Sequence, residues 1–107
     1  MMKKALLLLS GALLINFSVQ AAGNIEAGKS KSAKCVACHG MNGKVSIPTY
    51  PHLAGQNEVY LDYSMHAYKN GERTGNMASI MNAYVQKLSD QDIADLAAYY
   101  ASLGTKE

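Results

Sequence analysis

The first 21 residues differ in their hydrophobic pattern from the rest of the chain. Residues 5–15 form an apolar run of 11 residues, and only Ser10 and Gly11 interrupt it. This run is shorter than the ~20 apolar residues that a membrane-spanning helix needs. It follows a basic start that contains Lys3 and Lys4. A basic start before a short apolar run is typical of a secretory signal peptide.

The end of this segment offers a cleavage site. Val19-Gln20-Ala21 places small or tolerated residues where a signal peptidase cuts. We therefore expect a cleaved signal peptide at 1–21 and one mature domain at 22–107, with cleavage after Ala22 as the alternative. The mature domain would hold 86 of the 107 residues. A domain of this size usually needs a disulfide, a metal or a cofactor to supplement its core.

The pattern of residues 24–34 predicts the first helix of the mature chain. Asn24 can cap its N-terminus, and Glu26 suits the first turn. Gly28 interrupts the helix, where a glycine costs about 1 kcal/mol relative to alanine. We expect that another helix approaches closely at Gly28.

Residues 57–70 predict a second helix that ends at Gly71. Its apolar face, spaced as on one side of a helix, comprises Tyr60, Leu61, Met65 and Tyr68, together with Ser64. Between the first two helices, Pro48 and Pro51 exclude a regular helix and predict an ordered loop. Residues 71–81 are expected to form a second loop or short turn.

The last predicted helix begins after Ser89. Ser89 is a strong N-cap, and Asp92 three residues later can complete a capping box. Gly104 is the expected stop. The apolar stripe of this helix comprises Ile93, Leu96, Ala97, Tyr100 and Leu103, with Tyr99 on its flank. No segment of the chain shows a convincing strand pattern, so the sequence predicts an all-α fold.

Charge adds little to this interpretation. Loss of Lys3 and Lys4 with the signal peptide leaves eight basic residues, against eight acidic residues. A nucleic-acid-binding domain is usually strongly basic on one face. The near-neutral mature domain therefore argues against a nucleic-acid partner.

The chemistry-bearing motif is Cys35-Val36-Ala37-Cys38-His39. A C-x-x-C-H run is typical of covalent haem attachment, in which Cys35 and Cys38 form thioethers with the two vinyl groups. His39 would then bind the iron as the proximal ligand. A metal-bound histidine generally donates its second ring N–H to a carbonyl or carboxylate. A proline carbonyl in the loop after the motif is a candidate acceptor.

Three other interpretations of the cysteine pair are open. A thioredoxin-type dithiol lies between a strand and a helix, and no strand is predicted here. Structural zinc usually takes four nitrogen or sulfur ligands, and only His39, His52 and His66 could complete such a site. A disulfide between Cys35 and Cys38 would close a very small ring and stabilise little.

Taken together, these residues resemble a class I c-type cytochrome of the short bacterial single-haem kind. The features that carry the resemblance are the Cys35–His39 motif, Pro51-His52-Leu53-Ala54-Gly55, Met81, and the ending that starts at Leu88-Ser89-Asp90 and includes Tyr99-Tyr100. The resemblance covers the whole mature region. It implies a small cytochrome c fold, with three main helices and ordered loops around one covalently attached haem c and its iron.

The resemblance also implies roles for further residues. Pro51, twelve residues after His39, matches the proline whose carbonyl accepts from the proximal histidine. In this family the first and last helices cross closely, with a glycine of the first against an aromatic residue of the last. Gly28 matches that glycine. That aromatic residue would be Tyr99 or Tyr100.

The distal iron ligand is expected to be a methionine. In such relatives the methionine lies eight residues before the serine that caps the last helix. Met81 fits this spacing to Ser89, whereas Met77 lies twelve residues away. Met81 is therefore the favoured ligand. Met77 stays the alternative, because relatives often have a proline soon after the ligand methionine, whereas Asn82-Ala83-Tyr84 follows Met81. His52 and His66 are minor candidates.

With His39 and Met81 both bound, the iron would have no open position. The predicted function is therefore one-electron transfer by a periplasmic carrier, rather than an enzyme. Its partners would be a donor complex and a terminal oxidase or reductase, and it would be a monomer without stable membrane insertion. One alternative is a haem c subunit of a larger periplasmic dehydrogenase or oxidase complex. A gas-binding or peroxidase-like protein would instead need a labile sixth ligand.

Overall fold

The chain folds into helices joined by ordered loops. The computed structural model describes residues 22–45, 50–75 and 77–104, so the expected signal peptide lies outside the described residues. The elements are α1 (Ile25–Lys31), the 3-10 helix η1 (Ser32–Lys34), α2 (Val36–His39), α3 (Glu58–Lys69), α4 (Ala78–Val85) and α5 (Asp90–Ser102). The described residues contain no strand, and the all-α prediction is confirmed.

None of the helices in the described part of the chain combines the length and the apolar character needed to cross a membrane.

The predicted helix starts are confirmed by their caps. The Asn24 side chain accepts from the Ala27 backbone N–H at 2.8 Å, and Ser89 forms a capping box with Asp92. Asn57 caps α3 by accepting from the Tyr60 backbone N–H. The first predicted helix differs in one respect, because its last part is the separate 3-10 turn η1.

The expectation of a loop over residues 71–81 is wrong for its last part. Helix α4 begins at Ala78 and carries Met81 within it. No side chain caps α4, and its N-cap Met77 adopts a left-handed backbone conformation with φ 68°. The usual N-terminal signal, an oxygen-bearing side chain, is therefore absent at the N-cap position.

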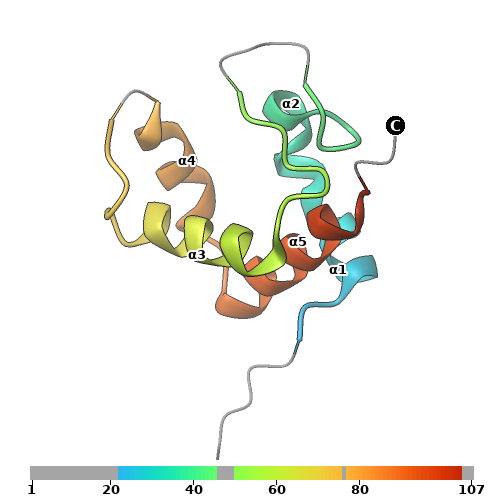
Figure 1. The fold of residues 1–107 in the computed structure, drawn as a ribbon. Helices are drawn as coiled ribbons and strands as arrows, with labels where there is room; N and C mark the ends of the chain where they lie inside the picture. The colour runs from blue at the N-terminus through green and yellow to red at the C-terminus, as the bar shows by residue number, and fades with distance from the viewer. Residues whose placement is uncertain (1–21, 46–49, 76, 105–107) are drawn as a thin grey trace, which may run out of the picture.

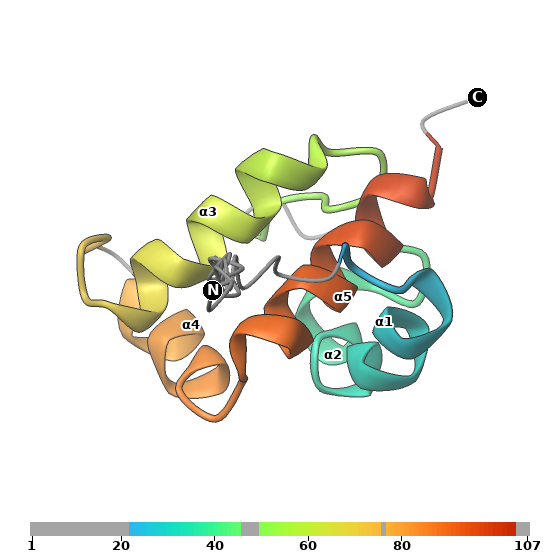
Figure 2. The same ribbon diagram turned by 90° about the horizontal axis from the view of Figure 1, so that it is seen from below.

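Helix α5 forms the centre of the packing. It contacts α1 on one side and α3 on the other, and α3 also contacts α4. In Figure 1, α4 stands at the left and α2 at the top, with α3 and α5 below them. Figure 2, which shows the molecule from below, has α3 and α5 next to each other. The most deeply buried side chains, Ile93 and Leu96, come from α5 with Val85 of α4.

The crossing of α1 and α5 depends on glycine. A Cβ added to Gly28 would lie 2.0 Å from the Asp95 carbonyl oxygen and 2.7 Å from the Tyr99 Cβ. The predicted close approach to an aromatic residue is confirmed, with Tyr99 as that residue. Gly23 makes a second such contact with α5, which the sequence did not predict. A Cβ added to Gly23 would lie 2.0 Å from the Ala94 carbonyl oxygen.

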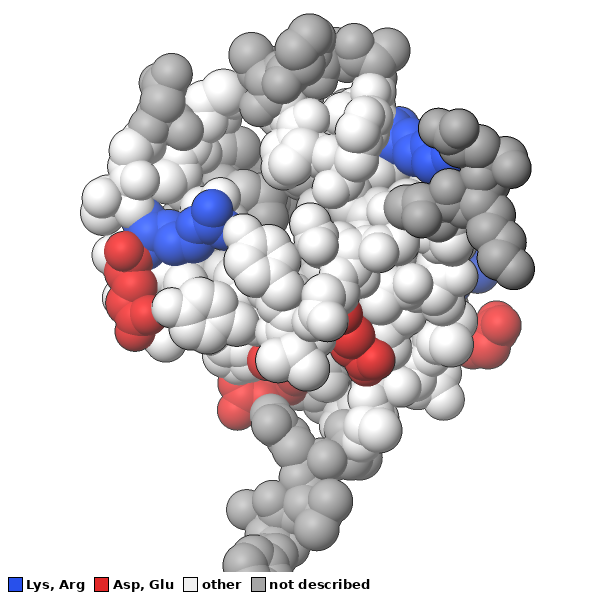
Figure 3. Space-filling view, in the orientation of Figure 1, with Lys and Arg blue, Asp and Glu red and all other residues white. Residues whose placement is uncertain are grey.

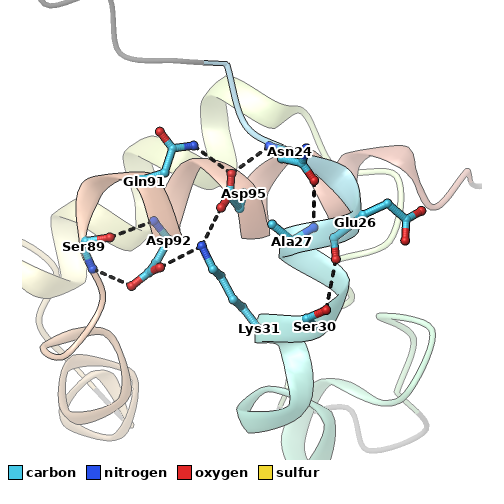
Figure 4. Close-up of polar contacts among 9 residues, drawn as sticks. All are labelled: Asn24, Glu26, Ala27, Ser30, Lys31, Ser89, Gln91, Asp92 and Asp95. Carbon is cyan, nitrogen blue, oxygen red and sulfur yellow. Dashed lines mark hydrogen bonds and ion pairs between the residues drawn. The ribbon is translucent and has the colours of Figure 1, made fainter.

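A buried carboxylate ties the same two helices together (Figure 4). The Asp95 side chain accepts from the Asn24 backbone N–H at 2.7 Å, from Lys31 Nζ at 2.5 Å and from Gln91 Nε2 at 2.8 Å. Lys31 also pairs with Asp92 at 2.8 Å. Burial raises the pKa of Asp95, but its three donors outweigh this and leave the pKa below the ordinary value.

Asp92 is stabilised as a carboxylate in the same way. The hydrogen bond from Lys31, followed by that from the Ser89 backbone, lowers the pKa of Asp92 to about 2. A carboxylate with a lowered pKa stabilises the fold above its unfolded-state pKa and loses this contribution as the pH falls through the folded-state value. The α1–α5 contact is therefore acid-sensitive.

We predict that Asp92→Asn destabilises the haem-loaded protein at pH 7 by about 1 kcal/mol. The difference from the unmodified protein should shrink between about pH 4 and pH 2, where Asp92 itself becomes protonated. Urea unfolding followed by circular dichroism at pH 7, 4 and 2 measures this. Glu72→Gln is the control, since Glu72 is exposed and makes no ion pair with a described residue. A pH-independent difference would contradict the assignment.

Candidate haem site

The helix α2 presents the two thiols and the imidazole of the motif to one cavity. Cys35 is the N-cap of α2, and His39 is its last residue. Cys35, Cys38 and His39 all line a cavity of about 280 Å³. Both cysteines are free thiols, and the His39 side chain is buried. The position of α2 follows from the α1–α5 contact, because only η1 separates α1 from Cys35.

A backbone carbonyl fixes the orientation of the imidazole. The His39 Nδ1 lies 2.9 Å from the Pro51 carbonyl oxygen. A carbonyl can only accept, so Nδ1 carries the proton and Nε2 keeps its lone pair for a metal. The structure thus brings His39 and Pro51 into the contact that the resemblance implied.

The loop that carries Pro51 is held by a glycine turn. The Gly43 carbonyl accepts from the backbone N–H groups of Leu53 at 2.7 Å and of Ala54 at 3.1 Å. Gly43 has φ +69°, and a Cβ there would lie 2.8 Å from the Ala54 nitrogen. Only glycine fits this conformation and this spacing without strain. The turn after the motif therefore positions the acceptor for the proximal histidine.

Helix α4 forms the other wall of the cavity. Met77 and Met81 both line it, and both are half-buried. Asn82, next to Met81, donates from Nδ2 to the Tyr68 carbonyl at 2.6 Å. Gln86 donates to the Lys69 carbonyl at 2.7 Å, so two side chains tie α4 to the end of α3. The structure brings both candidate methionines to the site.

The two histidines outside the motif differ in position. His52 lines the cavity, and its Nδ1 accepts from the Val45 backbone N–H at 2.9 Å. His66 does not line it and instead bridges α3 to the start of α5. Its hydrogen bond to Asp90 raises the pKa of His66, and Asp62 adds to the rise. His66 is thus engaged in an ion-pair cluster and is not available as a distal ligand.

The floor of the cavity is the apolar face predicted for α3. It consists of Tyr60, Leu61, Ser64, Met65 and Tyr68, joined by Leu96 and Tyr100 from α5. The cavity is also lined by Arg73, Ile80 and Tyr84, which the sequence pattern did not predict. Arg73 lies over the Tyr68 ring at 4.6 Å. Ile80 and Tyr84 line the cavity because they lie on α4, a helix that the sequence pattern did not reveal.

The residues present fit a covalently attached haem. Two thiols, one oriented imidazole and two methionine thioethers line one largely apolar space. The thiols can bond to the vinyl groups of a haem, and an imidazole with a thioether is the ligand pair that c-type haem iron uses. Two buried hydroxyl groups in the lining, Ser64 Oγ and Tyr100 OH, have no hydrogen-bond partner among the described residues. Buried polar groups are rarely left unpaired, so these hydroxyls also indicate a missing partner in the cavity.

The alternatives for the cysteine pair lack support in the structure. No three His, Cys, Asp or Glu side chains converge as a metal site within the described residues, which counts against zinc. Cys35 and Cys38 are not disulfide-bonded. The thioredoxin setting is absent, since residues 22–45, 50–75 and 77–104 contain no strand.

Comparison with known proteins agrees with this geometry. The family model described as cytochrome c matches residues 25–104. The chain is 51% identical over 81 residues to cytochrome c-554(548) of Halomonas halodenitrificans, covering 76% of this chain and 98% of that protein. It is 46% identical over 101 residues to cytochrome c4 of Pseudomonas aeruginosa, covering 94% of this chain and 49% of that protein.

A solved structure gives the same result at the level of the fold. The structure of reduced recombinant cytochrome c4 from Pseudomonas stutzeri superposes with a TM-score of 0.70 and 42% identity. The match covers 77% of this chain and 46% of that chain. The chain thus spans nearly the whole of the Halomonas protein but about half the length of the cytochrome c4 proteins.

We predict that each cysteine supplies one covalent link. Cys35→Ala or Cys38→Ala should leave one vinyl group unreacted, which moves the reduced pyridine haemochrome band to longer wavelength. The double variant should lose its haem to acidified organic solvent. Ala37→Ser, at the exposed position between the cysteines, should change neither property. Retention of haem by the double variant after extraction would contradict the assignment.

Proposed function

Because the chain belongs to the cytochrome c family, we propose that it is a periplasmic one-electron carrier whose haem iron is bound by His39 and Met81. A bound haem c supplies the redox chemistry, in which the iron cycles between the ferric and ferrous states. The observation that carries the proposal is the pairing of an oriented His39 imidazole with methionine sulfurs across one apolar cavity.

The protein's own residues support transfer without a bound substrate. Cys35 and Cys38 would fix the haem in place, and the Pro51 carbonyl would hold His39 in the required tautomer. A methionine from α4 would take the sixth position and leave none open. A thioether ligand favours the ferrous state, so this ligation raises the reduction potential.

Two features support Met81 over Met77 as the sixth ligand. Met81 lies within α4, next to Asn82, whose side chain ties the helix to α3. Met77 precedes the helix and serves as its N-cap in a left-handed conformation. A ligand on the anchored helix would keep its position in both oxidation states.

The proposed location rests on the N-terminal segment. Residues 1–21 have the composition of a cleaved signal peptide, which would leave residues 22–107 as a cytochrome c domain in the periplasm of a Gram-negative-type bacterium. Haem is attached to c-type cytochromes outside the bacterial cytoplasm, so export and the haem motif agree. The domain is proposed to remain free of the membrane after cleavage.

The surface around the cavity supports brief contacts with redox partners. Ile80 and Tyr84 line the cavity and are 42% and 47% exposed, while Met41 beyond the haem motif is 77% exposed. In Figure 3, the charged residues on this face are spread apart and leave a wide area without them. We propose apolar docking with modest electrostatic steering, as is typical of weak redox encounters. The protein would accept electrons from a donor complex and pass them to a terminal oxidase or reductase.

An alternative is a haem c subunit of a larger periplasmic dehydrogenase or oxidase complex. One observation favours it. Val59 and Tyr63 on α3 are 77% and 64% exposed, yet neither lines the haem cavity. Exposed apolar residues away from the redox site suit a permanent partner rather than a transient one.

We predict that Met81→Leu lowers the reduction potential, on the order of 100 mV, because the iron loses its thioether ligand. The ferric protein should also lose its weak red sulfur-to-iron charge-transfer band. Met77→Leu is the matched control and should preserve both. The opposite pattern, with the band lost only in Met77→Leu, would transfer the ligand role to Met77.

We predict that the native protein purified from its own cells behaves as a free carrier. Its mass in gentle detergent-free extracts, measured by light scattering, should equal that of one haem-loaded mature chain. Stable co-purification with a second polypeptide would establish the subunit alternative instead. Substitution of Tyr63 by Glu should then release the partner, whereas the same change should not affect a free carrier.

A further inference from the structure

The Tyr100 hydroxyl is a buried polar group that the proposed electron transfer does not use. Tyr100 lies on α5, is 3% exposed and lines the haem cavity. Its hydroxyl has no hydrogen-bond partner among the described residues. Leaving a buried donor unpaired is costly, because the group loses its hydrogen bonds to water. A phenylalanine would fill the same space without this cost, so the hydroxyl needs an explanation.

The sulfur of Cys35 is the neighbour that matters most to this hydroxyl. Burial raises the pKa of Tyr100, the nearby Cys35 sulfur raises it further, and Ser32 lowers it. Conversely, burial raises the pKa of Cys35, while Tyr100 acts on it in the opposite direction. Cys35 also packs against the core cluster that contains Tyr100. The two groups therefore lie close together in the lining of the cavity.

The surrounding backbone restricts the Tyr100 ring. The Tyr100 carbonyl accepts from the Gly55 backbone N–H at 2.9 Å. On another side, Gly43 is so close that an added Cβ would lie 3.0 Å from the Tyr100 Cδ1. The Tyr100 ring is thus packed closely against the turn at Gly43, and the loop that carries Pro51 is bonded to the Tyr100 backbone.

Haem attachment changes what the Cys35 sulfur can do. A free thiol is both a weak donor and a weak acceptor. Addition of the thiol across a vinyl group transfers its hydrogen to carbon, and the resulting thioether sulfur can only accept. Tyr100 then has to be the donor in any hydrogen bond between the two groups. A donor without a partner and a sulfur that becomes solely an acceptor are complementary.

We infer that Tyr100 is a positioning residue for the haem and that its hydroxyl donates a hydrogen bond to the thioether sulfur of Cys35. This inference rests on the proposed covalent attachment at Cys35. The bond would hold the thioether on the α5 side of the cavity and satisfy the buried hydroxyl.

Resonance Raman spectroscopy of the haem-loaded protein tests this inference. The carbon–sulfur stretching band of the thioether should shift when exchangeable protons are replaced by deuterium, because the donor becomes O–D. Tyr100→Phe should abolish this shift. Tyr99→Phe is the matched control, since Tyr99 is the adjacent buried tyrosine, does not line the cavity and should leave the shift intact.

A solvent-isotope shift that is lost in Tyr100→Phe and kept in Tyr99→Phe supports the hydrogen bond. No shift in the unmodified protein, or a shift that persists in Tyr100→Phe, overturns it. The pyridine haemochrome spectrum of the same samples reports whether two thioethers are present. Failure of attachment itself would thus be distinguished from absence of the hydrogen bond.

Discussion

The cavity between α2 and α4 is the constraint on which the rest of this structure depends. Four helices, α2, α3, α4 and α5, each turn a face toward it. The buried apolar side chains form only a small cluster, which comprises Leu61, Leu96, Ala97, Tyr99 and Tyr100. A domain this small is marginal when its core is built of side chains alone. The apolar faces around the cavity are buried further when a large apolar body such as haem fills it, so haem binding would stabilise the fold.

The two walls of the cavity have independent supports that meet on α5. The wall that carries His39 follows from α1, which is fixed on α5 by two glycine contacts and by the buried carboxylate of Asp95. The wall that carries the methionines is tied to α3 by Asn82 and Gln86, and α3 in turn packs on α5. Ligands held in this way change position little when the charge of the iron changes, which suits rapid electron transfer.

Local signals in the sequence predicted much of this arrangement. Asn24 and Ser89 marked helix starts because their side-chain oxygens act within three residues. Gly28 was recognisable because a glycine inside a helix is costly without a close neighbour. The contact between His39 and Pro51 followed from the family resemblance, and the structure shows the two atoms 2.9 Å apart. The roles of Cys35, Cys38, His39 and Met81 at the iron remain predictions.

The features that the sequence did not reveal depend on tertiary contacts. Helix α4 has no capping side chain, and its stability comes from packing on α3 rather than from a local signal. No local signal marks Asp95 as buried, because its partner Lys31 lies 64 positions away. Likewise, nothing local distinguishes the Tyr100 hydroxyl from that of Tyr99. Only the packing around Cys35 gives it significance.

The central claim is that α2 and α4 each supply one ligand and leave the iron closed. Carbon monoxide tests this directly, because it binds ferrous haem only where a coordination position is open or readily vacated. The ferrous, haem-loaded protein at neutral pH is predicted to keep its absorption spectrum after mixing with carbon monoxide. Rapid conversion to the carbon monoxide adduct would contradict a closed iron and favour a gas-binding or peroxidase-like site.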